Sequence, residues 1–287
     1  MDIGIGIPNS VPGATGAQLL EWARRADAAG FSSLASIGAL SYRSYEELTV
    51  FAAAGAVTER IRFLSNILLA PTRSSAELAK QALSVDQLTG SRLTLGLGVG
   101  WRTTDYELAG RDYHDRGRRF DAQLEDLHRA WAGEALRDGT RPVGPPPVQN
   151  GGPPILIGGM TDAAVRRAVR FGIGWTVGGA PPDRAAAMAE KVRAAWQEAG
   201  REGQPRLVAL AYFSLGDTES RSRESLLDYY LRAGEEAAQA VADGALRSAE
   251  VITATVERYQ GMGFDELILD PSVPDPEQVD LLAKVVR

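Results

Sequence analysis

The 287-residue sequence contains no cysteine and only two histidines, His114 and His128. The absence of cysteine excludes disulfides, thiolate metal sites and cysteine nucleophiles. Two histidines are also too few for the metal centres of barrel hydrolases, which draw several imidazoles from strand ends. We therefore predict no metal site, and the chemistry must come from other side chains or from a bound cofactor.

Long apolar runs and blocks of like charge are also missing. No stretch approaches the roughly 18 apolar residues of a membrane helix, and residues 1–8 lack the basic start of a signal peptide. The 31 basic and 37 acidic side chains are spread along the chain and give a net charge of -6. We expect a cytoplasmic protein that binds neither nucleic acid nor membrane.

Short apolar segments alternate regularly with amphipathic ones, a pattern typical of a parallel sheet with crossover helices. The length suits one barrel of about 250 residues, so we predict an α/β fold, a (β/α)8 TIM barrel, as a single domain over residues 1–287. The eight expected strands span residues 3–7, 33–37, 61–67, 93–99, 154–157, 173–177, 207–213 and 266–269. The eight expected helices span residues 16–29, 45–58, 74–88, 118–131, 161–170, 182–199, 248–260 and 276–286.

Three connections are longer than the median loop, and long loops in compact domains are often functional. Residues 100–117 form an insertion after the fourth strand. Residues 133–152 include a Gly-Pro-Pro-Pro run and are expected to form an extended surface connector. Residues 216–247 form an insertion after the seventh strand and carry their own helix pair. The last two are equally compatible with ordinary solvated insertions.

Active sites of such barrels lie at the carboxyl ends of the strands. There, Gly158, Gly159, Met160 and Thr161 join a strand to a helix, so their free N–H groups favour an anion such as phosphate. The alternative is a tight turn in which Thr161 or Asp162 only caps the helix. The segment LGLGVGW at residues 95–101 leaves room for a flat ligand or fits a crowded barrel interior. Its glycine spacing differs from the dinucleotide-binding fingerprint.

Several motifs, in order along nearly the whole chain, resemble the bacterial luciferase-like monooxygenase family. They are AAGAVTERIR at 53–62, LLAP at 68–71, LAKQ at 78–81, DQLTGSRL at 86–93, LGLGVGW at 95–101, RGRRFD at 116–121, PPILIGG at 153–159 and GFDELIL at 263–269. The resemblance implies a barrel that binds FMN or the deazaflavin coenzyme F420 at the carboxyl ends of its strands.

Site residues follow from the resemblance by position. Asn66 and Ile67 match a bulged strand with a non-proline cis peptide beneath the flavin ring. Gly98, Gly100 and Trp101 match a segment near the ring or its ribityl chain. The backbone of Gly158, Gly159, Met160 and Thr161 matches the part that holds the cofactor phosphate. From the strand ends we add a substrate pocket that consists of Asn9, Trp101, Trp175 and Tyr212.

The end of the second strand departs from the family pattern. Many members carry an Asp-His pair or a related acidic motif there, whereas this chain has Gly38 and Ala39. The catalytic residues are therefore unknown, and we expect His114 to be structural and paired with Asp115 or an arginine. The candidates to replace the missing acid, with a solvated or capping charge as the alternative for each carboxylate, are Asp105, Tyr106, Glu107, Tyr42, Tyr45, Glu46 and Tyr212.

These observations predict a flavoprotein oxidoreductase or monooxygenase that acts on a small organic substrate by hydride transfer or oxygen activation. The alternative is a flavin-binding or scaffold protein that has lost its acid/base group. FMN would require a separate flavin reductase, whereas F420 would require no partner. We also expect a homodimer that forms through the helices at residues 45–58 and 74–88, with Phe51 at the contact.

Overall fold

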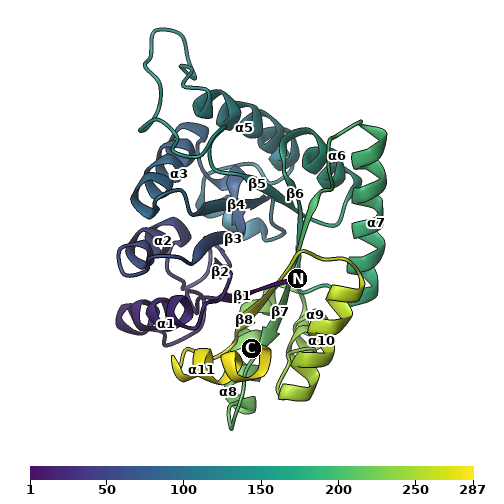
Figure 1. The fold of residues 1–287 in the computed structure, drawn as a ribbon. Coiled ribbons are helices and arrows are strands. Elements are labelled where there is room, and N and C mark those ends of the chain that lie inside the picture. The colour runs from purple at the N-terminus through teal and green to yellow at the C-terminus, as the bar shows by residue number, and fades with distance from the viewer.

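The computed structural model describes residues 1–287 and contains eight parallel strands that close into a barrel in sequence order. Helices surround the barrel on its outside (Figure 1). All eight strands fall where the sequence predicts them, with ends that differ by one or two residues. The strands are β1 (Asp2–Gly6), β2 (Ser33–Ser36), β3 (Arg62–Leu69), β4 (Leu93–Gly98), β5 (Ile155–Gly158), β6 (Gly174–Gly178), β7 (Arg206–Phe213) and β8 (Glu266–Pro271).

The eight predicted helices are also present, and their local sequence explains where they begin. Helix α2 starts later than predicted, because the carboxylate of Glu46 accepts hydrogen bonds from the N–H groups of Leu48 and Thr49 and caps the helix. The predicted helices are α1 (Gly16–Ala28), α2 (Glu47–Gly55), α3 (Ser75–Thr89), α5 (Arg116–Trp131), α6 (Asp162–Phe171), α7 (Pro182–Glu198), α10 (Ala249–Gly261) and α11 (Glu277–Val286).

The long connections differ from one another in structure. Residues 100–117 contain a short helix that the sequence did not predict, α4 (Thr103–Leu108). The insertion after β7 forms the expected helix pair, α8 (Glu219–Tyr230) and α9 (Glu235–Asp243), joined by a short turn. Residues 133–152 carry no helix or strand, and this connection extends outward beyond α5 (Figure 1).

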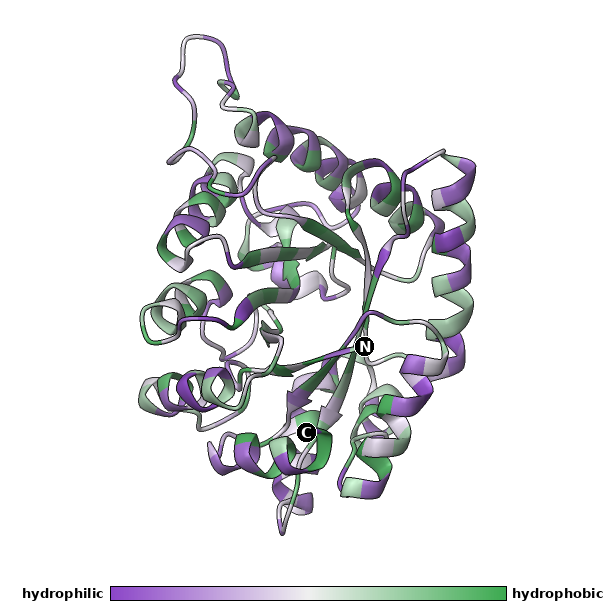
Figure 2. Cartoon of the chain, in the orientation of Figure 1, coloured by the Kyte–Doolittle hydropathy of each residue, from purple (hydrophilic) through white to green (hydrophobic).

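Apolar side chains form one core between the strands and the outer helices and a second core inside the barrel. The inner core includes Leu64, Leu156, Val208 and Ile268 and continues to the insertion after β7. Figure 2 shows largely hydrophobic strands, whereas the outer helices have mixed faces. This pattern is expected for parallel strands that are covered on both faces. None of the helices is both long and apolar enough to cross a membrane.

Candidate active site

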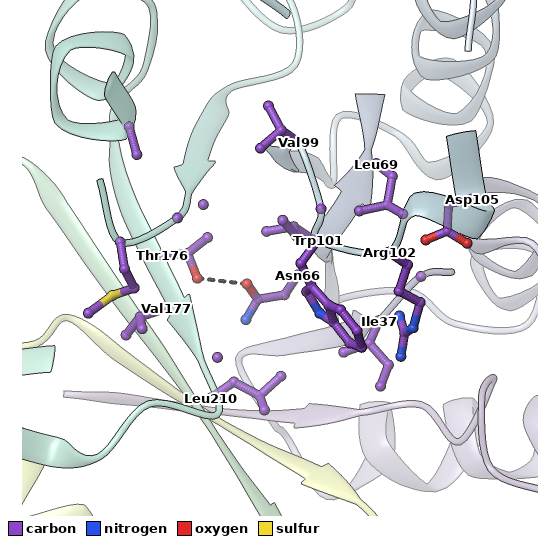
Figure 3. A pocket seen from close by; sticks show the side chains of 18 of the residues that line it. Ile37, Asn66, Leu69, Val99, Trp101, Arg102, Asp105, Thr176, Val177 and Leu210 are labelled. Carbon is purple, nitrogen blue, oxygen red and sulfur yellow. Dashed lines mark hydrogen bonds between the residues drawn. The ribbon is translucent and has the colours of Figure 1, made fainter. Parts of the chain in front are cut away.

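A cavity of about 490 Å³ opens at the carboxyl ends of the strands, which is the end of a TIM barrel where ligands bind. Its volume lies within the range typical of small-molecule sites. The cavity draws residues from β3, β6, β7, α8 and the loops after β2, β4 and β5. In Figure 3, Thr176 and Val177 lie on one side, Arg102 and Asp105 lie on the other, and Asn66 and Trp101 lie between them.

The floor of the cavity is formed by an irregular part of β3. As expected from the resemblance, the peptide bond between Asn66 and Ile67 is cis, and the pairing with β4 shifts between Ser65 and Leu68. The Thr176 hydroxyl donates a hydrogen bond of 2.7 Å to Oδ1 of Asn66 (Figure 3). Nδ2 of Asn66 is buried and has no acceptor within the protein, so the floor contains an amide donor that the protein itself leaves unpaired.

The loop between β5 and α6 has the features of an anion site. Thr161 caps α6, because its hydroxyl accepts a hydrogen bond from the N–H of Ala164 at 3.3 Å. The preceding main-chain N–H groups, those of Gly159, Met160 and Thr161, have no acceptor within the protein. Unpaired N–H groups at a helix start favour a phosphate. Thr161 therefore caps the helix and still leaves the preceding N–H groups unpaired.

Eight of the nine predicted cofactor residues line this cavity, and Gly98 does not. A β-carbon at Gly98 would lie 2.1 Å from Cδ1 of Ile67, so Gly98 leaves room for the Ile67 side chain in the floor. The lining residues are Asn66, Ile67, Gly100, Trp101, Gly158, Gly159, Met160 and Thr161.

Of the residues predicted for the substrate pocket, Trp101 and Tyr212 line the cavity, whereas Trp175 and Asn9 do not. Neighbouring strand residues face opposite sides, so the inward Thr176 leaves Trp175 outside the barrel, where it is fully buried and donates to the Gly159 carbonyl at 2.7 Å. The Asn9 amide donates to the carbonyls of Ile37 and Tyr45 and ties two loops together.

A buried carboxylate fills the space beside Gly38, at the end of β2. A β-carbon at Gly38 would lie 1.6 Å from Oε1 of Glu47, so a larger residue could not be accommodated without moving that side chain. Burial raises the pKa of Glu47, although its ion pair with Arg73 at 3.1 Å opposes the shift. The sequence draws attention to Glu46, whereas the burial of its neighbour Glu47 is visible only in the fold.

Most of the candidate replacement acids have structural partners. Asp105 lines the cavity, but its Oδ1 accepts hydrogen bonds from the backbone and hydroxyl of Ser41 at 2.6 Å. The Tyr106 hydroxyl donates to the Val99 carbonyl. The Tyr42 hydroxyl donates to Asp228. Outside the cavity, Glu46 caps α2, and Tyr45 and Glu107 are exposed.

Tyr212 has a partner that no sequence pattern indicates. Its hydroxyl lies 2.7 Å from that of Tyr230, at the end of α8, and both residues line the cavity. Burial raises the pKa of both phenols, so they stay protonated at neutral pH. Asp270 pairs with Tyr212 in the register of β7 and β8, and burial raises the pKa of its carboxyl well above the usual value. This part of the cavity therefore holds two phenolic proton donors.

Neither histidine lies at the cavity. His114 is exposed and does not pair with Asp115, whose carboxylate binds Arg119 at 2.7 Å, so the expected pair is wrong. His128 is exposed on α5 and contacts the carbonyl of Phe171 at 3.0 Å. We expect His114→Ala and His128→Ala each to keep at least about a tenth of wild-type turnover, a barrier change below about 1.4 kcal/mol. Steady-state kinetics on the two folded, cofactor-loaded variants test this, and a thousandfold loss in either would mean that the site is misplaced.

The family model of luciferase-like monooxygenases matches residues 1–269. An uncharacterised protein of Mycobacterium tuberculosis is 34% identical over 208 residues, which cover 62% of this chain and 71% of that protein. The FMNH2-dependent dimethylsulfone monooxygenase of Pseudomonas putida is 27% identical over 67% of this chain and 55% of its own length. An F420-dependent secondary alcohol dehydrogenase, solved with an F420-acetone adduct, superposes with a TM-score of 0.81 at 16% identity, over 99% of this chain and 98% of its own.

Proposed function

We propose that this chain, which belongs to the luciferase-like monooxygenase family, is an oxidoreductase that holds FMN or coenzyme F420 in the cavity at the barrel mouth. Its substrate would be a small organic molecule that shares the cavity with the cofactor. The two relatives named for their cofactors support both choices, because one is FMNH2-dependent and the other is F420-dependent.

One observation carries this proposal: a single cavity joins a phosphate-type site to an unpaired amide donor on its floor. The N–H groups of Gly159, Met160 and Thr161 lie at one end of the lining, and Nδ2 of Asn66 lies on the floor. A cofactor that carries a phosphate on a chain attached to a flat polar ring requires both features. The residues present therefore fit either cofactor.

These contacts indicate which steps the cofactor would carry out and which the residues of the chain would carry out. When bound, reduced FMN supplies oxygen activation, or F420 supplies hydride exchange. The loop after β5 would hold the phosphate, and Asn66, kept in place by Thr176, would orient the ring. The Tyr212 and Tyr230 hydroxyls, which lie 2.7 Å apart and line the cavity, would donate a proton to the substrate.

The test is to identify the cofactor that the purified protein retains or binds. We expect an absorption spectrum and a mass that match FMN or F420, with turnover in the presence of that cofactor in its reduced form. Turnover with reduced FMN and oxygen would require a separate flavin reductase, because all eight strands belong to the barrel and none forms a nicotinamide-binding domain. Failure to bind either cofactor at high micromolar concentration would contradict the proposal.

We further propose that the protein is a homodimer, since closed two-fold pairs are the commonest oligomers. Phe51 cannot contribute as expected, because it is fully buried against Phe63 within the chain. Leu88 at the end of α3 is 68% exposed, and we propose it as the apolar residue at the dimer contact instead of Phe51. We expect light scattering at micromolar concentration to give the mass of a dimer and Leu88→Glu to give that of a monomer. A monomeric wild-type protein would refute the proposal.

A further inference from the structure

Arg102, in the loop after β4, carries a buried positive charge on the cavity wall. The residue is only 6% exposed and lines the cavity opposite Thr176 (Figure 3). Its guanidinium carbon lies 4.4 Å from the ring centre of Trp101 and 4.3 Å from that of Tyr229. Two aromatic faces therefore hold the guanidinium in a fixed orientation.

No carboxylate balances this charge. The structure contains no ion pair of Arg102, and its hydrogen bonds go to the carbonyl of Tyr229 at 2.8 Å and to the hydroxyl of the same residue at 3.5 Å. Neither neighbouring carboxylate is paired with the guanidinium: Oδ1 of Asp105 accepts hydrogen bonds from Ser41 while its Oδ2 has no partner, and Asp228 accepts a hydrogen bond from Tyr42. A buried cation is costly unless an anion pairs with it, and Arg102 is one of the residues that line the cavity.

The position of Arg102 separates it from the proposed phosphate site. The N–H groups that suit a phosphate follow β5, beside the strand that carries Thr176, whereas Arg102 lies across the cavity from Thr176 (Figure 3). The wall around Arg102 is aromatic, with Trp101, Tyr229 and Tyr230. A ligand that fills this corner would meet the Arg102 guanidinium and several aromatic faces.

We propose that Arg102 is the anion-binding residue of a substrate subsite for planar organic anions, such as aromatic or conjugated carboxylates. The carboxylate would pair with the guanidinium, and the unsaturated frame would pack against Trp101 and Tyr230. This inference rests on the proposed function, because it assigns the remainder of the cavity to the cofactor. It names the substrate class of that site.

The experiment uses three probes of similar size: benzoate, its neutral analogue benzamide and the non-planar anion cyclohexanecarboxylate. Each is titrated by calorimetry into the protein loaded with FMN or F420, whichever it binds. We expect benzoate to bind about tenfold more tightly than either of the other probes, because only benzoate satisfies both the charge and the aromatic faces.

Two substitutions test whether Arg102 causes the preference for benzoate over benzamide. Arg102→Gln should weaken benzoate binding about tenfold and leave benzamide binding unchanged. Arg111→Gln is the matched control, since it removes an exposed arginine from the same loop and should change neither affinity. Circular dichroism and the cofactor dissociation constant show whether each variant is folded and competent.

The possible outcomes separate this subsite from the proposed function. Equal affinity of the loaded protein for benzoate and benzamide would overturn the subsite and leave cofactor binding intact. A large loss of cofactor affinity in Arg102→Gln would also overturn it, because the arginine would then belong to the cofactor site. If neither cofactor binds, the proposed function fails. A benzoate preference of the cofactor-free protein that disappears in Arg102→Gln would still support the subsite.

Discussion

Replacing Tyr212 by phenylalanine should lower turnover about a hundredfold, the usual contribution of a positioned general acid. The substitution removes only the hydroxyl, which lies 2.7 Å from that of Tyr230 in the cavity. No histidine lines the cavity, so this phenol is the hydroxyl to which the proposal assigns the proton transfer. Steady-state kinetics on the cofactor-loaded variant measure the effect, and the cofactor dissociation constant should stay at its wild-type value.

Two companion variants show whether the position of the hydroxyl matters. Tyr230→Phe should have a smaller effect, because it removes the partner hydroxyl and leaves that of Tyr212 in the cavity. Tyr259→Phe is the control, since it removes a buried phenol on α10 that packs against Phe264 far from the cavity lining. If Tyr212→Phe keeps half of the wild-type turnover while fully loaded, another group or water supplies the proton.

The barrel was predictable because its signals are local and repeated. Eight short apolar segments alternate with amphipathic ones, and this rhythm alone indicates the closed parallel sheet. The helix start with unpaired N–H groups after β5 was predictable for the same reason, because paired glycines and the capping Thr161 are adjacent in sequence. Each of these features can be predicted from a short stretch of neighbouring residues.

The sequence does not show which side chains of a strand point into the barrel and which point outward. Parallel strands are apolar on both faces, so the hydrophobicity of β6 does not tell which of Trp175 and Thr176 faces the inside. For this reason the sequence led to Trp175, whereas the structure places Thr176 in the cavity lining. Its neighbour Thr176 supports Asn66 in the floor.

The aromatic and charged wall of the cavity depends on tertiary packing. Tyr229 and Tyr230 belong to the insertion after β7 and reach the mouth only because α8 packs over it. Arg102 is one of many arginines in the sequence, and its unpaired burial appears only in the fold. Asp270 directly follows the predicted end of the eighth strand, so the rule that favours strand ends could have found it.

Replacing Gly159 by valine should weaken cofactor binding at least tenfold while the protein remains folded. Gly159 has a φ of +128°, a conformation that a β-branched residue rarely adopts. A β-carbon there would also lie 3.3 Å from that of Ala164. To relieve both conflicts the loop must rotate, which turns the N–H groups of Met160 and Thr161 away from the phosphate position. Titration of the cofactor, followed by absorbance or fluorescence, measures the loss.

A valine at Gly110 separates strain in the backbone from loss of the anion site. Gly110 also has a positive φ, +61°, but a β-carbon added there would meet nothing within 4 Å in the exposed loop after α4. Gly110→Val should therefore reduce the melting temperature through strain and leave the cofactor dissociation constant unchanged. Because the two variants share the substitution and a positive φ, a loss of affinity confined to Gly159→Val points to the loop at the start of α6. Wild-type affinity in a folded Gly159→Val protein would remove the phosphate from this loop.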